Sequence, residues 1–126
     1  MAANKAQNVV AELQDGKKYR MDFDMGALAN AECIYEQRFG KSVGVDVIIR
    51  DLIQGKAHAV MAFAYGAMIS AEEKVTWKQF CESIFTFANY QKLTDVVSEA
   101  LTGMMKTEED VPEEGDEKNA RSRGAN

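Results

Sequence analysis

Histidine and proline occur once each in this chain of 126 residues, as His58 and Pro112, and cysteine occurs only twice, as Cys33 and Cys81. A metal centre built on several histidines is therefore excluded. The two cysteines are far apart, and neither belongs to a Cys-x-x-Cys motif or lies near the histidine. We expect two buried, reduced thiols, and neither a disulfide framework nor a zinc site.

The sequence also lacks long apolar runs and an excess of positive charge. Its longest apolar stretch, Ala59 to Ile69, is about half of what a bilayer-spanning helix needs, and no secretion signal is recognisable at the N-terminus. The net charge is -5, and lysine and arginine form no basic stripe of the kind that binds phosphates. We expect a cytoplasmic protein that binds neither membranes nor nucleic acid.

Motifs that would indicate catalysis are missing. We find no GxSxG, no glycine-rich phosphate loop, no HExxH and no calcium-binding loop. His58 precedes an apolar segment and is interpreted as a surface or helix-start residue. The sequence therefore predicts a protein that is not an enzyme and that has no catalytic residues, cofactor or metal.

The composition that remains is that of one small folded domain, with 46% hydrophobic and 28% charged residues. We predict an α+β, mainly α fold: an N-terminal β-hairpin followed by about five helices in a compact single domain. Residues 1–8 are predicted to be a flexible N-terminus and residues 9–105 to form the hairpin and helices. Residues 106–126 are predicted to be a disordered acidic tail, because almost none of their side chains could be buried.

The hairpin is predicted between Val9 and Phe23, where two short runs flank Asp15-Gly16. Asp-Gly favours a type I′ turn, which connects antiparallel strands in two residues. In the second run Tyr19, Met21 and Phe23 alternate with polar residues, as on a half-buried strand.

Three helices are predicted in the middle of the chain. The first begins after Asp22 or Asp24 as N-cap and ends at Gly40. The second follows the apolar spacing of "VDVIIRDLIQG", with Asp46 and Arg50 placed for an ion pair, and stops at Gly55. Residues 57–69 are apolar on nearly every side, which predicts either the central helix of the fold or one covered by another subunit.

Two further helices are predicted before the tail. Thr76 and Gln79 form a capping-box pattern at the start of a helix that continues to Ala88. A break near Asn89 precedes an amphipathic helix from Tyr90 to Met105. The apolar side of that last helix contains Leu93, Val97, Ala100, Leu101 and Met104, and is widened by Val96 and Met105.

Two glutamates interrupt the apolar side of the first helix. Glu32 and Glu36 are four residues apart and reach the same side as Leu28 and Phe39. A diiron site would require Glu-x-x-His motifs that one histidine cannot supply, which leaves a partly hydrated boundary or a contact with another polypeptide. We expect Glu32 to accept a hydrogen bond or ion pair from the hairpin or a neighbouring segment, and Glu36 to be more exposed. The cations considered for these carboxylates are Arg20, Arg38 and Arg50.

The methionines allow two interpretations. Met61 and Met68 are predicted to be core residues, whereas Met104 and Met105 suit either the core or a surface that adapts to a partner.

The order of segments resembles a known family. The hairpin around "QDGKKYRMDF", the helix "MGALANAECIYEQRFGKSV", an apolar helix and a helix opening "VTWKQF" together resemble the tail assembly chaperones of long-tailed bacteriophages and related proteins of gene transfer agents. The resemblance covers Val9 to Met105. Its most specific residues are Gly26 to Leu28, Glu32 and the turn from Gly40 to Ser42.

This resemblance implies a non-enzymatic protein of the host cytoplasm that binds and solubilises the tape measure protein and helps to recruit tail tube proteins. It also implies a homo-oligomer that is absent from the mature virion, and a longer frameshifted product would be expected to arise after Lys106. The candidate partner-binding residues are Glu32, Glu36, Phe39, Leu93, Val97, Leu101, Met104 and Met105.

Two alternatives stay open. A structural head-tail connector or tail-completion protein of a phage particle would also be small, acidic and oligomeric. A small antitoxin-like regulator would need a basic DNA-binding face, which the sequence does not provide.

Overall fold

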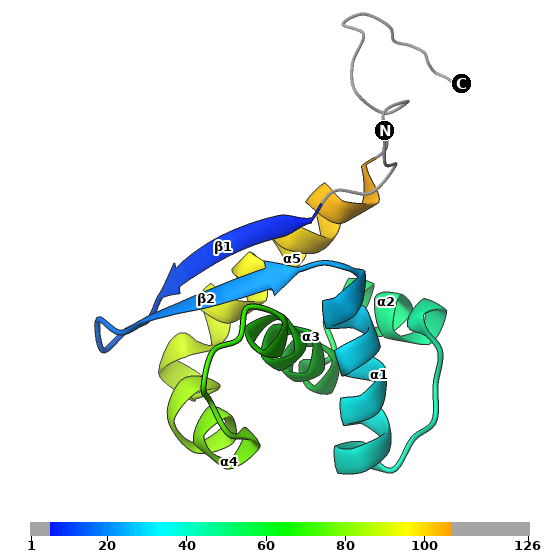
Figure 1. Ribbon diagram of the computed structural model, residues 1–126, viewed down its shortest axis with the longest axis horizontal. Coiled ribbons are helices and arrows are strands. Elements are labelled where there is room, and N and C mark those ends of the chain that lie inside the picture. Colours follow the sequence, from blue (N-terminus) through cyan, green and yellow to red (C-terminus); the bar gives the residue numbers. More distant parts are fainter. Residues whose placement is uncertain (1–5, 107–126) are drawn as a thin grey trace, which may run out of the picture.

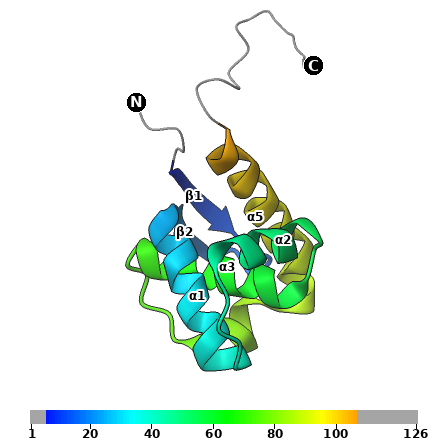
Figure 2. The same cartoon turned by 90° about the vertical axis from the view of Figure 1, so that its right-hand side faces the viewer.

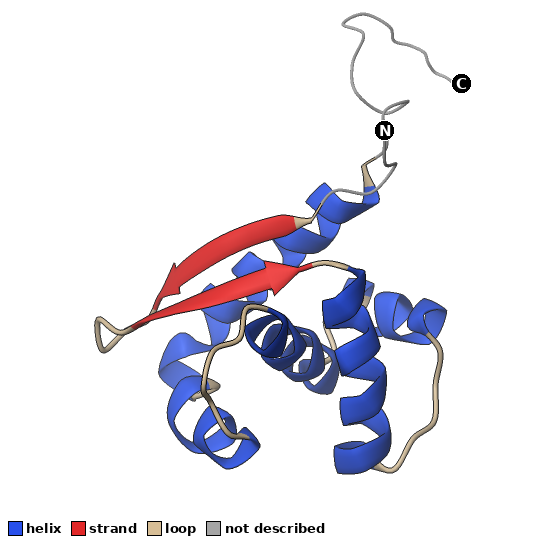
Figure 3. Ribbon diagram, in the orientation of Figure 1, coloured by secondary structure: helices blue, strands red, loops and turns tan. Residues whose placement is uncertain are grey.

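The computed structural model describes residues 6–106, and it confirms the expected α+β, mainly helical architecture with a hairpin first (Figures 1 and 3). The elements are β1 (Gln7–Glu12), β2 (Lys18–Phe23), α1 (Met25–Phe39), α2 (Val45–Ile53), α3 (Ala57–Ser70), α4 (Trp77–Gln79), a π-helix (Phe80–Ile84), a 3-10 turn (Phe87–Asn89) and α5 (Tyr90–Met105). Strand β1 begins two residues before the expected start of the domain at Val9. The tail predicted for residues 106–126 lies, beyond Lys106, outside the described residues. Each helix within residues 6–106 is too short or too polar to cross a bilayer.

The hairpin has the expected strands but a different turn. Its antiparallel register runs without a bulge from Gln7 opposite Phe23 to Glu12 opposite Lys18. The Leu13 carbonyl accepts from the Gly16 amide at 2.9 Å, and the Leu13 amide donates to Lys17. Within the loop only Gly16 has a positive φ, of 86°. The predicted type I′ turn is therefore wrong, because it requires a positive φ at Asp15 as well.

Helix α3 is the centre of the fold, as one of the two interpretations of its sequence predicted. It contacts β2, α1, α2 and α5, and Figures 1 and 2 show it beneath the hairpin and beside α1. Phe63 is completely buried, with its ring centroid 4.9 Å from that of Phe23. Gly66 permits close approach to α1, since a Cβ atom there would lie only 2.6 Å from the Ala27 carbonyl oxygen.

The ends of α1 and α2 follow from their flanking residues. The Asp24 carboxylate accepts from the Ala27 amide at 2.8 Å and from the Ser70 hydroxyl at 3.0 Å, so the N-cap also joins α1 to α3. Gly40 closes α1 in the left-handed conformation, with φ of 70°. The expected Asp46–Arg50 ion pair is not among the contacts of the described residues.

The segment after α4 departs from the prediction. Thr76 caps α4 by accepting from the Gln79 amide at 3.0 Å, as expected. The helix then widens into a π-helix, which closes when the Phe85 amide donates to the Phe80 carbonyl at 2.7 Å. The predicted continuous helix to Ala88 is wrong beyond Ile84, because the π-helix turns the chain while keeping Phe80 and Ile84 in the core.

Candidate protein-binding surface

The apolar side of α5 is core and not a free surface. Leu93, Val97, Leu101 and Met104 are between 0% and 7% exposed. They pack against the hairpin and α3, which leaves no room for a partner chain. Four of the candidate partner-binding residues are therefore corrected to core residues. Met105, the last of the helix, is 50% exposed and stays a candidate.

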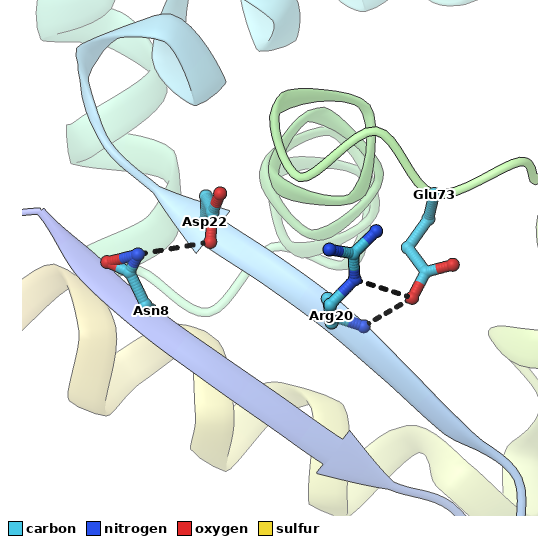
Figure 4. Close-up of polar contacts among 4 residues, drawn as sticks. All are labelled: Asn8, Arg20, Asp22 and Glu73. Atoms are coloured by element: carbon cyan, nitrogen blue, oxygen red, sulfur yellow. Dashed lines mark hydrogen bonds and ion pairs between the residues drawn. The ribbon is translucent and has the colours of Figure 1, made fainter.

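The two glutamates of α1 show the expected order of exposure but not the expected contact. Glu32 is half-buried and Glu36 is exposed. Within residues 6–106 neither carboxylate takes part in a hydrogen bond or ion pair, so the predicted partner for Glu32 is wrong. Arg20 binds Glu73 instead: its backbone amide donates to Glu73 at 2.7 Å, and its guanidinium Nε lies 3.6 Å from the same oxygen (Figure 4).

Phe39 is half-buried in a chain of aromatic contacts. Its ring lies 5.6 Å from Tyr35 and 6.1 Å from Trp77, measured between centroids. The Arg38 guanidinium lies 5.6 Å from the Trp77 ring centroid, in a cation–π contact. The chain continues from Trp77 through Phe80, Phe85 and Tyr90, with 5.8 Å between successive ring centroids.

This aromatic chain ends at a surface cleft next to Phe87. The cleft, of about 350 Å³, is lined by Ala57, Phe85, Thr86, Phe87 and Tyr90. The Phe87 side chain is 99% exposed, the highest value among the large exposed hydrophobic residues. We call this region the Phe87 cleft. Because an apolar hollow with an exposed ring at its rim can receive an apolar side chain, we take this region as the candidate protein-binding surface.

The loop that carries Phe87 is held from both sides by Asn89. The buried Asn89 side chain donates to the Ile84 carbonyl at 3.0 Å and accepts from the Gln14 amide at 2.9 Å. These bonds tie the loop to the end of the π-helix and to the hairpin loop. The position of Phe87 is thus set by tertiary contacts, which explains why helical spacing did not single it out.

A second polar feature lies between α1, α2 and α3. The buried Asp51 carboxylate accepts from the Tyr35 hydroxyl at 2.8 Å and lies 3.5 Å from both Lys56 Nζ and His58 Nε2. Burial disfavours its ionised form, but the hydrogen bond from Tyr35 and the charges of Lys56 and His58 outweigh burial and lower the pKa of Asp51. Burial, and then the adjacent carboxylate, raise the pKa of Tyr35.

The Asp51 cluster is interpreted as structural. Sequence reasoning missed Asp51, which looked like one more polar residue of an amphipathic helix. His58 is at the start of α3, as predicted. His58 and Tyr35 both contact the buried Asp51 carboxylate and partly replace its lost hydration. Among residues 6–106 no three metal-ligating side chains lie together.

The sulfur-containing side chains differ in how far they are buried. Both cysteines are free, but Cys33 is exposed, so the expectation of two buried thiols is wrong for it. Burial raises the pKa of the half-buried Cys81 thiol. Met68 and Met104 are buried and Met61 packs partly buried against the core.

Comparison with known proteins identifies no relative: no protein-family model, curated protein or solved structure matches this chain.

Proposed function

We propose that this protein is a tail assembly chaperone of a long-tailed bacteriophage. In the host cytoplasm it binds the tape measure protein, keeps it soluble, helps to recruit tail tube proteins, and leaves before the virion is complete. It performs no catalysis and needs no cofactor. The proposal starts from the resemblance of Gly26 to Leu28, Glu32 and Gly40 to Ser42 to that family.

The residues of the resemblance shape α1 and its ends. A Cβ atom at Gly26 would lie 3.2 Å from the capping Asp24 oxygen, so glycine leaves the cap undisturbed. Leu28 is buried at 2% exposure, and Gly40 supplies the left-handed residue that ends the helix. These roles support a shared fold, since they concern helix boundaries and packing and involve no reactive group.

The observation that carries the functional proposal is the Phe87 cleft. A fully exposed phenylalanine gives the monomer no burial energy, whereas covering it with a partner would gain roughly 1.5–3 kcal/mol. The apolar face of a tape measure helix offers side chains every three to four residues, and such side chains can enter an apolar hollow beside an aromatic anchor. We assign the client-binding role to this surface, in place of the buried side of α5.

Co-expression with the tape measure protein of the phage genome that carries this gene tests the proposal. We expect that protein to be soluble with the wild-type chain and with Met25→Asp, a control that alters another exposed apolar residue, 55% exposed. It should be insoluble with Phe87→Asp. A tape measure protein whose solubility does not depend on the wild-type chain contradicts the proposed function. Solubility preserved by Phe87→Asp would show that the client binds elsewhere.

Mass spectrometry of purified virions separates the chaperone from a structural connector or tail-completion protein. A chaperone should be absent from finished particles. Its presence at a fixed stoichiometry with the other structural proteins would favour the connector.

A further inference from the structure

The π-helix Phe80–Ile84 lies directly before the Phe87 cleft. Its closing bond runs from the Phe85 amide to the Phe80 carbonyl, at 2.7 Å, where an α-helix would use the Cys81 carbonyl. The turn therefore encloses one residue more than an α-helical turn does. Such turns are rare and occur frequently at functional sites.

An α-helix over the same residues would place Phe87 on another side. Phe87 follows Phe80 by seven residues and Ile84 by three, so the three side chains share one side of an α-helix. Phe80 and Ile84 are 0% and 1% exposed, whereas Phe87, in the π-helical conformation, is 99% exposed. The sequence therefore suits two conformations of this segment, of which only one presents Phe87 to solvent.

Space for a withdrawn Phe87 ring exists next to its present position. The hollow of about 350 Å³ that Phe87 borders is also lined by Phe85, Tyr90 and Ala57. Moving an exposed phenylalanine ring out of water is favourable, and the α-helix is the more common backbone geometry. Both effects favour the α-helical conformation, so a specific contact has to stabilise the π-helical one.

The Asn89 side chain provides that contact. Its amide group donates to the Ile84 carbonyl at 3.0 Å, and an α-helix would give this carbonyl to the Ala88 amide. Its oxygen accepts from the Gln14 amide of the hairpin loop at 2.9 Å. Because Asn89 is only 5% exposed, water competes little for these bonds. Opening the contact frees the Ile84 carbonyl for the α-helical bond.

We propose that residues 80–89 switch between these two conformations and that Asn89 is the latch of the switch. In the presented state the latch is closed, the segment is π-helical and Phe87 is exposed. In the withdrawn state the latch is open, the segment is α-helical, and Phe87 lies on the side of Phe80 and Ile84. The switch rests on the client-binding role proposed for the Phe87 cleft, and it gives that surface a way to release its client. A client that contacts only the presented state shifts the population toward it.

Amide hydrogen exchange without any client tests the two states. Asn89→Ala removes both latch bonds and should raise the ratio of withdrawn to presented molecules about 30-fold. From a withdrawn population of about 3–10% in wild type, the Ala88 amide should then exchange about two- to fourfold more slowly. An Ala88 amide that exchanges as fast as in wild type, or faster, overturns the proposal, because Asn89 would then only hold a loop in place.

Deletion of Glu82 is the matched control. It removes the extra residue of the π-helix, so the Phe80 carbonyl and the Phe85 amide form an α-helical bond and the segment that follows keeps its orientation. Glu82 is exposed, so no core side chain is lost. Combined with Asn89→Ala, the deletion should return the Ala88 exchange rate to that of wild type. Slow exchange that persists in the double variant overturns the switch.

Relaxation-dispersion NMR of the wild-type chain decides the case even if a variant does not fold. The amides from Phe85 to Asn89 should exchange on the microsecond-to-millisecond timescale with a minor state. A wild-type chain without such exchange in this segment overturns the proposal.

Co-purification of the tape measure protein tests the regulatory consequence. Affinity falls in proportion to the presented fraction, so Asn89→Ala should retain about two- to fourfold less tape measure protein, and the double variant should regain it. Equal retention by Asn89→Ala, despite a slowed Ala88 amide, overturns the regulatory role. A wild-type chain that binds no tape measure protein refutes the proposed function instead, while the exchange measurements still decide whether the two states exist.

Discussion

Asp51 shows how one buried charge organises three helices. Its carboxylate receives a hydroxyl from α1, an ammonium from the α2–α3 connection and an imidazole from α3. A buried carboxylate is tolerated only when such partners replace its lost hydration. The position of Asp51 within α2 therefore depends on residues that are distant in sequence and adjacent in space.

Replacing Asp51 by alanine should be costly and replacing it by asparagine less so. Asp51→Ala leaves the Tyr35 hydroxyl without its acceptor, and we expect the free energy of unfolding to fall by about 3 kcal/mol. Asp51→Asn keeps an oxygen for Tyr35 and loses only attractions to Lys56 and His58, which are partly exposed, so we expect a loss of about 1 kcal/mol. Urea unfolding at neutral pH measures both. Equal losses for the two variants would contradict this account.

The stabilisation that Asp51 provides should depend on pH, and the lowered pKa of its carboxyl group fixes the direction. The pKa of Asp51 in the folded protein lies below its ordinary value of 3.8. Its ionisation therefore stabilises the fold above that value, and this contribution is lost as the pH falls through the folded pKa. The stability difference between wild type and Asp51→Asn should be largest above about pH 5 and shrink in more acidic solution. A difference that grows on acidification would contradict the assignment.

At the scale of elements, the contact between α1 and α3 depends on Gly66. A side chain there would meet the Ala27 backbone, which cannot rotate away as a side chain can. Gly103, in α5, is a matched contrast, because the three atoms nearest to a Cβ atom there would all belong to the long side chain of Gln7.

Gly66→Ala and Gly103→Ala should therefore have opposite effects. Overpacking at Gly66 costs about 3 kcal/mol and the better helix propensity of alanine offsets about 1, so we expect a net loss of about 2 kcal/mol. Gly103→Ala should be neutral or stabilising by up to about 1 kcal/mol. Thermal or urea unfolding of both variants measures the difference. A tolerated Gly66→Ala would mean that α1 and α3 can separate without loss.

At the scale of the whole molecule, the Phe87 cleft and the Asp51 cluster are two regions with no shared residues. Effects at separate sites without common partners are usually additive. We expect Phe87→Asp to abolish client binding while the free energy of unfolding stays within about 0.5 kcal/mol of wild type, because Phe87 is 99% exposed. Co-purification with the tape measure protein and urea unfolding measure the two properties. A loss of stability of several kcal/mol in Phe87→Asp, on the scale of a core substitution, would show that Phe87 supports the fold.

Local patterns were sufficient to predict most elements of this fold. The alternation of Tyr19, Met21 and Phe23 predicted β2, Asp24 and Gly40 predicted the ends of α1, and the spacing of apolar residues predicted α5 with the bounds that the structure shows. These features depend on neighbours within a few residues, because helix and strand periodicity and capping are local properties of the chain.

Tertiary structure alone decided the candidate site. The apolar side of α5 could face a partner or the core with the same spacing, and packing against the hairpin and α3 made it core. The π-helix and the Asn89 contacts directed Phe87 into solvent, and Glu73 bound the outward-facing amide of Arg20 on β2. Periodicity shows that a face is apolar, but only the arrangement of distant segments decides what covers it.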